Sequence, residues 1–168
     1  MKNYFALALT CLSLQVVSAA LAQSPHDLPS SYSHQYDAQQ RREIEQLLKN
    51  YERLLNAGDV GGIVQLYTDD AVLLAPEAPS AVGIKAVRNA YTGIFQAIAL
   101  NITFEIAEVK LLSPEWAFLR SSSKGAVKIL ANGAQVAGSN QELFVLHKSQ
   151  GRWKIARYSF SSVLPPAK

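Results

Sequence analysis

Cysteine is nearly absent from this sequence: its 168 residues include one, Cys11, close to the N-terminus. Residues 1–22 follow the order of a secretory signal peptide, with Lys2, an uncharged apolar run over residues 4–17, and small residues that end at Ala22. Cleavage after Ala22 would remove the only thiol. That loss excludes disulfides, cysteine nucleophiles and thiolate metal sites from the mature chain. We therefore predict a periplasmic or secreted protein.

Long apolar runs and clusters of one charge are also missing. The run over residues 4–17 is shorter than the ~20 residues that span a bilayer, so we favour a cleaved signal over a membrane anchor. Basic residues are scattered through a chain of net charge +3, which argues against a nucleic-acid partner. His26 and His34 have no further ligands near them, and no glycine-rich phosphate loop occurs. We expect no metal, no cofactor and, after cleavage, no membrane partner.

The remaining chain divides into three parts. Residues 23–36 are rich in Ser, Pro and His and predict a flexible leader, residues 37–162 form one domain, and residues 163–168 are a tail. Apolar residues at helical spacing predict three helices in the first half of the domain. The first begins at a capping box that starts with Asp37, and Asp59 caps the second, short helix. The third covers residues 84–98.

The second half of the domain alternates with a period of two, which is typical of strands. We expect a turn at Asp69 and Asp70, a short strand over residues 71–75, and a hairpin centred on Asn132 and Gly133. The long strands are predicted over residues 102–109, 116–130, 135–148 and 153–161. The fold class is α+β: three N-terminal helices packed on a strongly curved antiparallel sheet with a cone-shaped hollow between them.

The hairpin turns predict which side chains share a face of the sheet. If Asn132 and Gly133 are the central pair, Arg120 faces Val145. One face then carries Phe118, Arg120, Ser122, Gln141, Leu143, Ala156, Tyr158 and Phe160. The other carries Phe144, Leu146, Trp153 and Ile155. Because both faces are apolar, we predict a homodimer through the second face.

Several segments, in this order, resemble the NTF2-like superfamily. They are residues 51–59 (YERLLNAGD), residues 63–72 (IVQLYTDDAV), Pro76 and Gly83. The segment over residues 151–156 (GRWKIA), followed by Phe160, is similar to the SnoaL-like and DUF4440 (SgcJ/EcaC) branch. The resemblance implies a cone with a pocket between helices and concave sheet, and often a dimer. It does not imply one reaction.

A distant similarity to ketosteroid isomerases bears on catalysis. It places the isomerase tyrosine on Tyr51, the general base on Ala75 and the second acid on or near Leu143. Both carboxyl groups are therefore missing, and we exclude isomerisation by that mechanism. The resemblance implies that the pocket-facing strand positions are Phe118, Arg120, Ser122, Ala156 and Phe160.

The predicted ligand site combines the resemblance with the strand register. Its residues are Tyr51, Phe118, Arg120, Ser122, Gln141, Leu143, Tyr158 and Phe160. An arginine on an apolar face needs an anionic or carbonyl partner, which is either a ligand or a structural group such as Glu105 or Glu108. We predict a pocket for a small hydrophobic carbonyl or carboxylate ligand. The alternatives are a SnoaL-like isomerase, cyclase or hydrolase that uses Tyr51 and Arg120, and a non-catalytic dimerisation or interaction domain.

Overall fold

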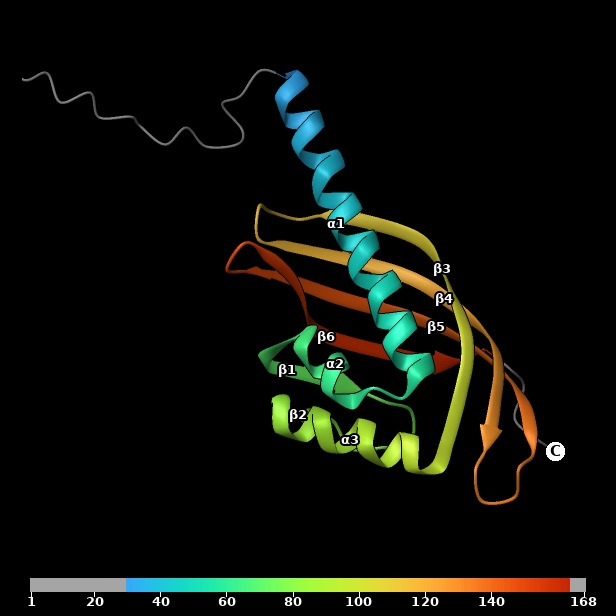
Figure 1. The fold of residues 1–168 in the computed structure, drawn as a ribbon. Coiled ribbons are helices and arrows are strands. Elements are labelled where there is room, and N and C mark those ends of the chain that lie inside the picture. Colours follow the sequence, from blue (N-terminus) through green and yellow to red (C-terminus); the bar gives the residue numbers. More distant parts are fainter. Residues whose placement is uncertain (1–29, 164–168) are drawn as a thin grey trace, which may run out of the picture.

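The computed structural model describes residues 30–163, and the predicted signal peptide, the first part of the leader (23–29) and residues 164–168 lie outside the described part (Figure 1). Three helices and six strands follow one another along the chain. They are α1 (Ser30–Ala57), α2 (Val60–Gln65), β1 (Tyr67–Leu74), β2 (Ala81–Val82), α3 (Ile84–Ala97), β3 (Ile98–Leu111), β4 (Trp116–Ile129), β5 (Gln135–Ser149) and β6 (Arg152–Ser162).

Helix α1 is longer than predicted. It begins at Ser30 rather than at Asp37, so the part of the leader that the structure describes is helical. No proline or glycine interrupts the chain from Ser30 to Ala57, and nothing in that segment therefore stops a helix upstream of Asp37. Gly58 ends the helix with a φ of +64°, a conformation that glycine adopts without steric cost. No helix within residues 30–163 is both long and apolar enough to cross a membrane.

The two shorter helices begin where the sequence places them. The Asp59 side chain accepts a hydrogen bond from the Gly62 backbone N–H at 2.8 Å and caps α2, as predicted. Helix α3 begins directly after Gly83, and its buried side chains are Val87 and Tyr91. These two residues lie one helical turn apart, so α3 presents a single apolar side to the protein interior.

The six strands form one sheet in the order β2-β1-β6-β5-β4-β3. The prediction of an antiparallel sheet is wrong at one place, because β1 pairs with β6 in parallel and the sheet is mixed. The parallel pair joins residues far apart in sequence, such as Leu73 and Tyr158, and local periodicity carries no information about that pairing. Asp69 and Asp70 lie within β1, with both side chains exposed, and not in a turn.

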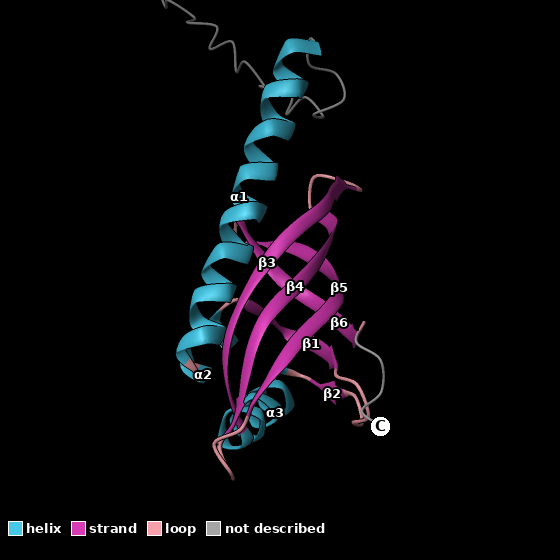
Figure 2. Cartoon of the chain, turned by 90° about the vertical axis from the view of Figure 1, so that its right-hand side faces the viewer, coloured by secondary structure: helices cyan, strands magenta, loops and turns pink. Residues whose placement is uncertain are grey.

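Helix α1 lies along the edge strand β3 (Figure 2) and occupies its free backbone groups. The Asn56 side chain donates to the Ile102 carbonyl at 2.8 Å and accepts from the Ile102 N–H at 2.9 Å. The Glu52 carboxylate accepts from the Phe104 N–H at 2.7 Å, and Arg41 donates to the Val109 carbonyl. These bonds cover an edge that would otherwise pair with another chain, and they fix α1 over the sheet.

The hairpin between β4 and β5 closes around a longer turn than predicted. Gln135 pairs with Lys128, and the Ile129 N–H donates to the Ala134 carbonyl at 2.8 Å, so residues 130–133 form the loop. Of the predicted central pair only Gly133 has a positive φ, whereas the predicted two-residue turn needs it at both positions. The register therefore moves by two residues and Arg120 faces Leu143. A shift of two residues leaves each side chain on its own face.

A β-bulge in β6 changes the faces that the sequence predicted. Near the turn Leu146 pairs with Ile155, but the next residue of β5, Val145, pairs with Arg157. One residue of β6, Ala156, is left without a partner, and beyond it the parity of β6 is reversed. Tyr158 consequently pairs with Phe144. The predicted face that joined Tyr158 and Phe160 to Arg120 is therefore wrong.

The two faces of the sheet have different roles. We call the face covered by the helices the inner face; its side chains Leu119, Phe144, Leu146, Trp153 and Ile155 are all buried in the core. We call the opposite side the outer face; it carries the exposed side chains of Arg120, Ser122, Gln141 and Leu143. The predicted dimer surface of Phe144, Leu146, Trp153 and Ile155 is thus core, because these residues meet the apolar stripe of α1 and not solvent.

Candidate functional site

A pocket of about 440 Å³ lies between α1, α3 and the inner face of the sheet, and we call it the central pocket. Its wall is mostly aliphatic and aromatic, with residues that include Leu55, Leu73, Ile94, Leu100, Ile102 and Phe104. A shallower groove of about 590 Å³ runs outside α1, from Gln39 to Asn50, past the turn before Trp153. Most of its lining residues have polar or charged side chains, among them Arg42, Glu43 and Arg152. A concave, mainly apolar lining with few polar groups is typical of small-molecule sites, so the central pocket is the stronger candidate.

The described residues that line the central pocket include no charged or histidine side chain. Polar atoms reach it from tyrosine hydroxyls and from a short group of small polar side chains on β4 and β5, among them Ser123 and Asn140. Burial of an ionised ligand in such a lining would be costly without an opposite charge. The lining therefore favours an uncharged ligand over a carboxylate.

Three tyrosine hydroxyls meet at the inner end of this lining. The hydroxyl of Tyr91 on α3 lies 2.7 Å from that of Tyr51 on α1 and 2.7 Å from that of Tyr67 on β1. The Tyr51 ring is also held edge-on against Phe144 at 5.8 Å and against Tyr158 at 5.7 Å, measured between ring centroids. Residues from a helix and the sheet thus fix the position of Tyr51.

The hydroxyl chain keeps one donor available. Three hydroxyl protons and two hydroxyl–hydroxyl bonds leave one proton outside this chain, and its position depends on the direction of the bonds. At the Tyr51 end the neighbouring hydroxyl of Tyr158, which forms a hydrogen bond with Tyr51, is a second acceptor besides a ligand. Tyr51 and Tyr91 line the pocket, whereas Tyr67 does not. Burial raises the pKa of Tyr91 to about 12, and the pKa of Tyr51 also rises well above its usual value because of burial. Both groups are therefore neutral hydrogen-bond donors at physiological pH.

A carboxyl group that the sequence prediction overlooked lies behind the wall of the pocket, bonded to the lining residue Ser123. Glu142 on β5 is 5% exposed and points to the inner face, where it pairs with Phe160 on β6. It accepts hydrogen bonds from the hydroxyls of Ser121 at 2.8 Å and of Ser123 at 2.5 Å. Burial raises the pKa of Glu142, and the two serine bonds lower it in part.

The structure brings only some of the predicted site residues together. Tyr51, Tyr158 and Phe160 line the central pocket, as do Leu73 and Ala75. The other predicted ligand contacts, which all point to the outer face, are Phe118, Arg120, Ser122, Gln141 and Leu143.

Arg120 has a structural partner on the outer face. Its Nε donates to the Glu108 carboxylate at 2.8 Å, and its side chain is 57% exposed. The sequence left open whether Arg120 pairs with a ligand or with a structural acid. The structure pairs it with the structural acid Glu108. The placement of Arg120 in the pocket is therefore corrected, and with it the predicted cation for a ligand carboxylate.

Three features of the pocket could have been predicted from signals in the sequence. Tyr91 falls in the apolar stripe of the third predicted helix, and Tyr67 ends the second predicted helix, although the structure places it at the start of β1. Glu142 and the Ser121 and Ser123 pair occupy alternate positions on neighbouring strands, which is the spacing of side chains on one face. The inner face was misidentified, so this polar group was placed on the predicted dimer face.

A family model described as the SnoaL-like domain matches residues 48–156 of this chain. The match begins within α1 and ends at Ala156, so it contains Tyr51, Tyr91 and Glu142. Among curated proteins no sequence matches this chain.

Solved structures with the same fold include proteins with named and unnamed activities. A ketosteroid isomerase-like protein from Erwinia carotovora atroseptica SCRI1043 has 36% identity and a TM-score of 0.70, over 73% of this chain and 95% of that one. An NTF-2 like protein of unknown function from Shewanella oneidensis MR-1 has 23% identity and a TM-score of 0.57, over 72% and 98%. A hexachlorocyclohexane dehydrochlorinase of type 2 has 10% identity and a TM-score of 0.68, over 80% and 99%.

Proposed function

The chain belongs to the SnoaL-like domain family and has the NTF2-like α+β fold, and from this premise we propose that its central pocket binds a small, mainly apolar molecule that has a carbonyl group and no negative charge. The observation that carries the proposal is the lining itself: an uncharged, mainly apolar wall with tyrosine hydroxyls at its inner end. The predicted cone, in which a strongly curved sheet surrounds such a pocket, is part of the same proposal.

The hydroxyl chain supplies the polar contact. A ligand carbonyl beside Tyr51 would favour the arrangement in which Tyr67 donates to Tyr91 and Tyr91 donates to Tyr51. The Tyr51 proton then points to the ligand, and no buried hydroxyl loses its partner. A carboxylate fits less well because the lining offers no cation and Glu142 lies close by.

An enzyme that uses Tyr51 together with Arg120 is not compatible with this geometry. Tyr51 packs on the inner face, whereas Arg120 lies on the outer face in its ion pair with Glu108. The two side chains cannot contact one ligand. The binding proposal therefore uses the apolar lining, Tyr51 and its hydroxyl neighbours, and does not use Arg120.

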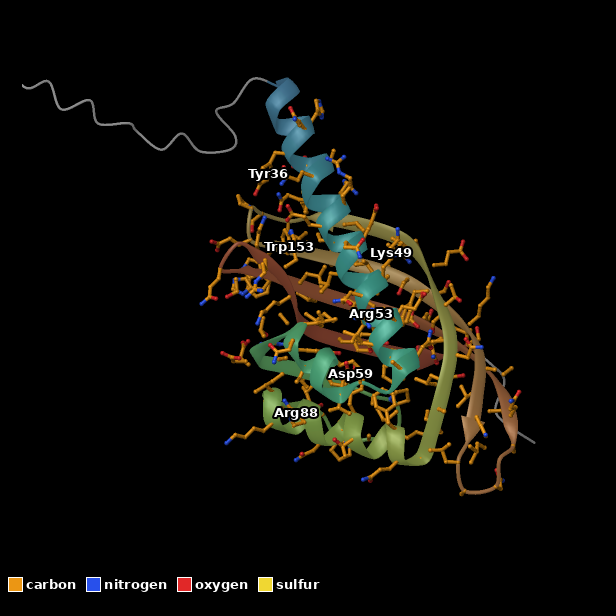
Figure 3. All side chains as sticks on the ribbon, in the orientation of Figure 1. Tyr36, Lys49, Arg53, Asp59, Arg88 and Trp153 are labelled. Carbon is orange, nitrogen blue, oxygen red and sulfur yellow. The ribbon has the colours of Figure 1, made fainter. Side chains whose placement is uncertain are left out.

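The proposal is tested with two aromatic probes of one shape, acetylnaphthalene and naphthoate, by isothermal calorimetry. We expect the ketone to bind and the carboxylate to bind at least about tenfold more weakly, because its charge would be buried without a partner. Tyr51→Phe should weaken ketone binding about threefold to tenfold, the value of one neutral hydrogen bond. Tyr36→Phe, at the far end of α1 (Figure 3), is the matched control. Tighter binding of the carboxylate would contradict the proposal.

We further propose that a second copy of the chain covers the outer face. Trp116 (40% exposed) and Leu143 (44% exposed) stand out from this face, and the ion pair of Arg120 with Glu108 offers both charges to a two-fold partner. Leu143→Glu should shift the protein to a monomer in light scattering. Val136→Glu, which adds the same charge near the hairpin tip, should not. A wild-type monomer at micromolar concentration would contradict the dimer.

We also propose that the mature protein acts in the periplasm or outside the cell. The support is the signal-like order of residues 1–22. N-terminal sequencing of the protein from cell fractions should find Gln23 first. A cytoplasmic protein that still begins with Met1 would contradict this.

A further inference from the structure

Glu142 is a buried acid that lacks a cationic partner. The ion pairs within residues 30–163 join Arg120 to Glu108, Lys148 to Glu43 and Arg157 to Asp70, so none of them involves Glu142. Its carboxylate contacts are two neutral serine hydroxyls. Buried carboxylates in proteins are normally paired with a cation, because removal of the charge from water is costly.

The two serine bonds leave part of the carboxylate unused. Ser121 donates to Oε2 and Ser123 donates to Oε1, so each oxygen accepts one bond and keeps a second lone pair. The two oxygens are thus held in place by neighbouring side chains of β4. A fixed carboxylate with free acceptor sites is suited to a group that donates several hydrogen bonds.

This carboxylate is separated from the central pocket by one side chain. Ser123, which bonds to Glu142, lines the pocket itself, and so does Phe160, the strand partner of Glu142. Asn140 also lines the pocket, and its amide lies 3.4 Å from the Ser123 hydroxyl. Ser123 therefore connects the wall of the pocket to the Glu142 carboxylate.

We propose that Glu142, Ser121 and Ser123 form a second polar subsite of the central pocket, which binds a protonated amine on the ligand. The subsite rests on the proposed function, since it uses the same pocket, and it adds a second ligand group to that function. The ligand class becomes an apolar molecule with a carbonyl at the tyrosine end and an amino group at the β4–β5 wall. The raised pKa of Glu142, caused by burial, is consistent with a carboxyl that still lacks this cation.

The choice of an amine over a neutral hydroxyl follows from charge. A hydroxyl would add one more neutral donor to the two serines and leave the buried charge uncompensated. An ammonium group supplies both the donors and the opposite charge, and charge-assisted hydrogen bonds are about twice as strong as neutral ones. The subsite also repels a ligand carboxylate, which strengthens the preference that the uncharged lining already sets.

The test compares three probes on the naphthalene ring, naphthylmethylamine, naphthylmethanol and acetylnaphthalene, by calorimetry at neutral pH. The wild type should bind the amine about tenfold more tightly than the alcohol. Glu142→Gln should remove that preference and leave the affinity for the alcohol within about twofold. Its amide can accept from one serine and donate to the other, and thermal unfolding checks that the variant is folded.

Glu108→Gln is the matched control, because it neutralises an acid on the outer face. It should leave all three affinities unchanged. Equal binding of amine and alcohol by the wild type, or an unchanged preference in Glu142→Gln, overturns the subsite. If acetylnaphthalene binds while the amine preference is absent, the subsite fails and the proposed function stands. If the amine binds with its preference but the ketone does not bind, the proposed function fails and the subsite stands.

Discussion

The inner and outer faces of the sheet are built from the same strands, residue by residue in alternation, yet they differ in almost every property. On β5, Glu142 and Phe144 are buried against the helices, whereas Leu143 between them is 44% exposed. The ion pair of Arg120 with Glu108 lies on the outer face, whereas the contacts of the Glu142 carboxylate on the inner face are serine hydroxyls. Substitutions at two neighbouring residues, one on each face, can therefore distinguish effects on the pocket from effects on the surface.

The largest expected difference between the faces is in core packing. Phe144 stacks on Tyr158 at 4.2 Å between ring centroids and is 1% exposed. Phe144→Ala should lower the free energy of unfolding by about 3–5 kcal/mol, because it removes this packing and leaves a cavity. Leu143→Ala, one residue away on the outer face, should cost less than about 1 kcal/mol. Urea unfolding measures both, and equal losses would remove the distinction between the faces.

A smaller difference is expected in the pH dependence of stability. Burial raises the pKa of Glu142 in the folded protein, so the folded state holds this proton over a range where the unfolded chain has released it. Stability from this group is therefore highest below the ordinary glutamate pKa and falls as the pH rises through the raised value. Thermal unfolding of Glu142→Gln should lack this decline relative to the wild type.

The outer-face acid supplies the control for that comparison. Glu108→Gln should keep the decline of the wild type, because Glu108 is exposed beside Arg120. If the decline disappears in Glu108→Gln and persists in Glu142→Gln, the pH dependence of stability does not come from Glu142, and this prediction is wrong.

The smallest effect is expected from the exposed ion pair. The side chains of Arg120 and Glu108 are 57% and 39% exposed, and pairs of this kind contribute about 0–1 kcal/mol. Arg120→Ala should change the free energy of unfolding by no more than about 0.5 kcal/mol and should leave acetylnaphthalene binding unchanged. A strong loss of ketone binding would contradict this placement and indicate that Arg120 contacts the ligand, as the sequence predicted.

Local signals in the sequence identified most of the elements correctly. The Asp59 cap, the apolar side of α3 and the turn before Trp153 all depend on residues close together in the chain. The family resemblance rests on the order of such segments, and the SnoaL-like match over residues 48–156 confirms it.

The sequence could not reveal which face the helices cover. The bulge at Ala156 reverses the parity of β6, and no glycine or other local signal marks it. The turn at Asn132 and Gly133 is two residues longer than its sequence suggests, and that alone moved the partner of Arg120. Tyr51 was found because the resemblance to ketosteroid isomerases pointed to it, and its place on a helix does not depend on strand register. Glu142 was overlooked because its role depends on that register.

The most direct test of the central claim is a map of backbone amide chemical shifts on addition of acetylnaphthalene. The account predicts changes at inner-face and pocket positions such as Leu73, Ser123, Asn140 and Phe160. It predicts no change at Arg120 and Leu143, although both lie within three residues of a pocket residue in the chain. Changes gathered at Arg120 and Leu143, with none at Ser123 and Phe160, would contradict the account and place the ligand on the outer face.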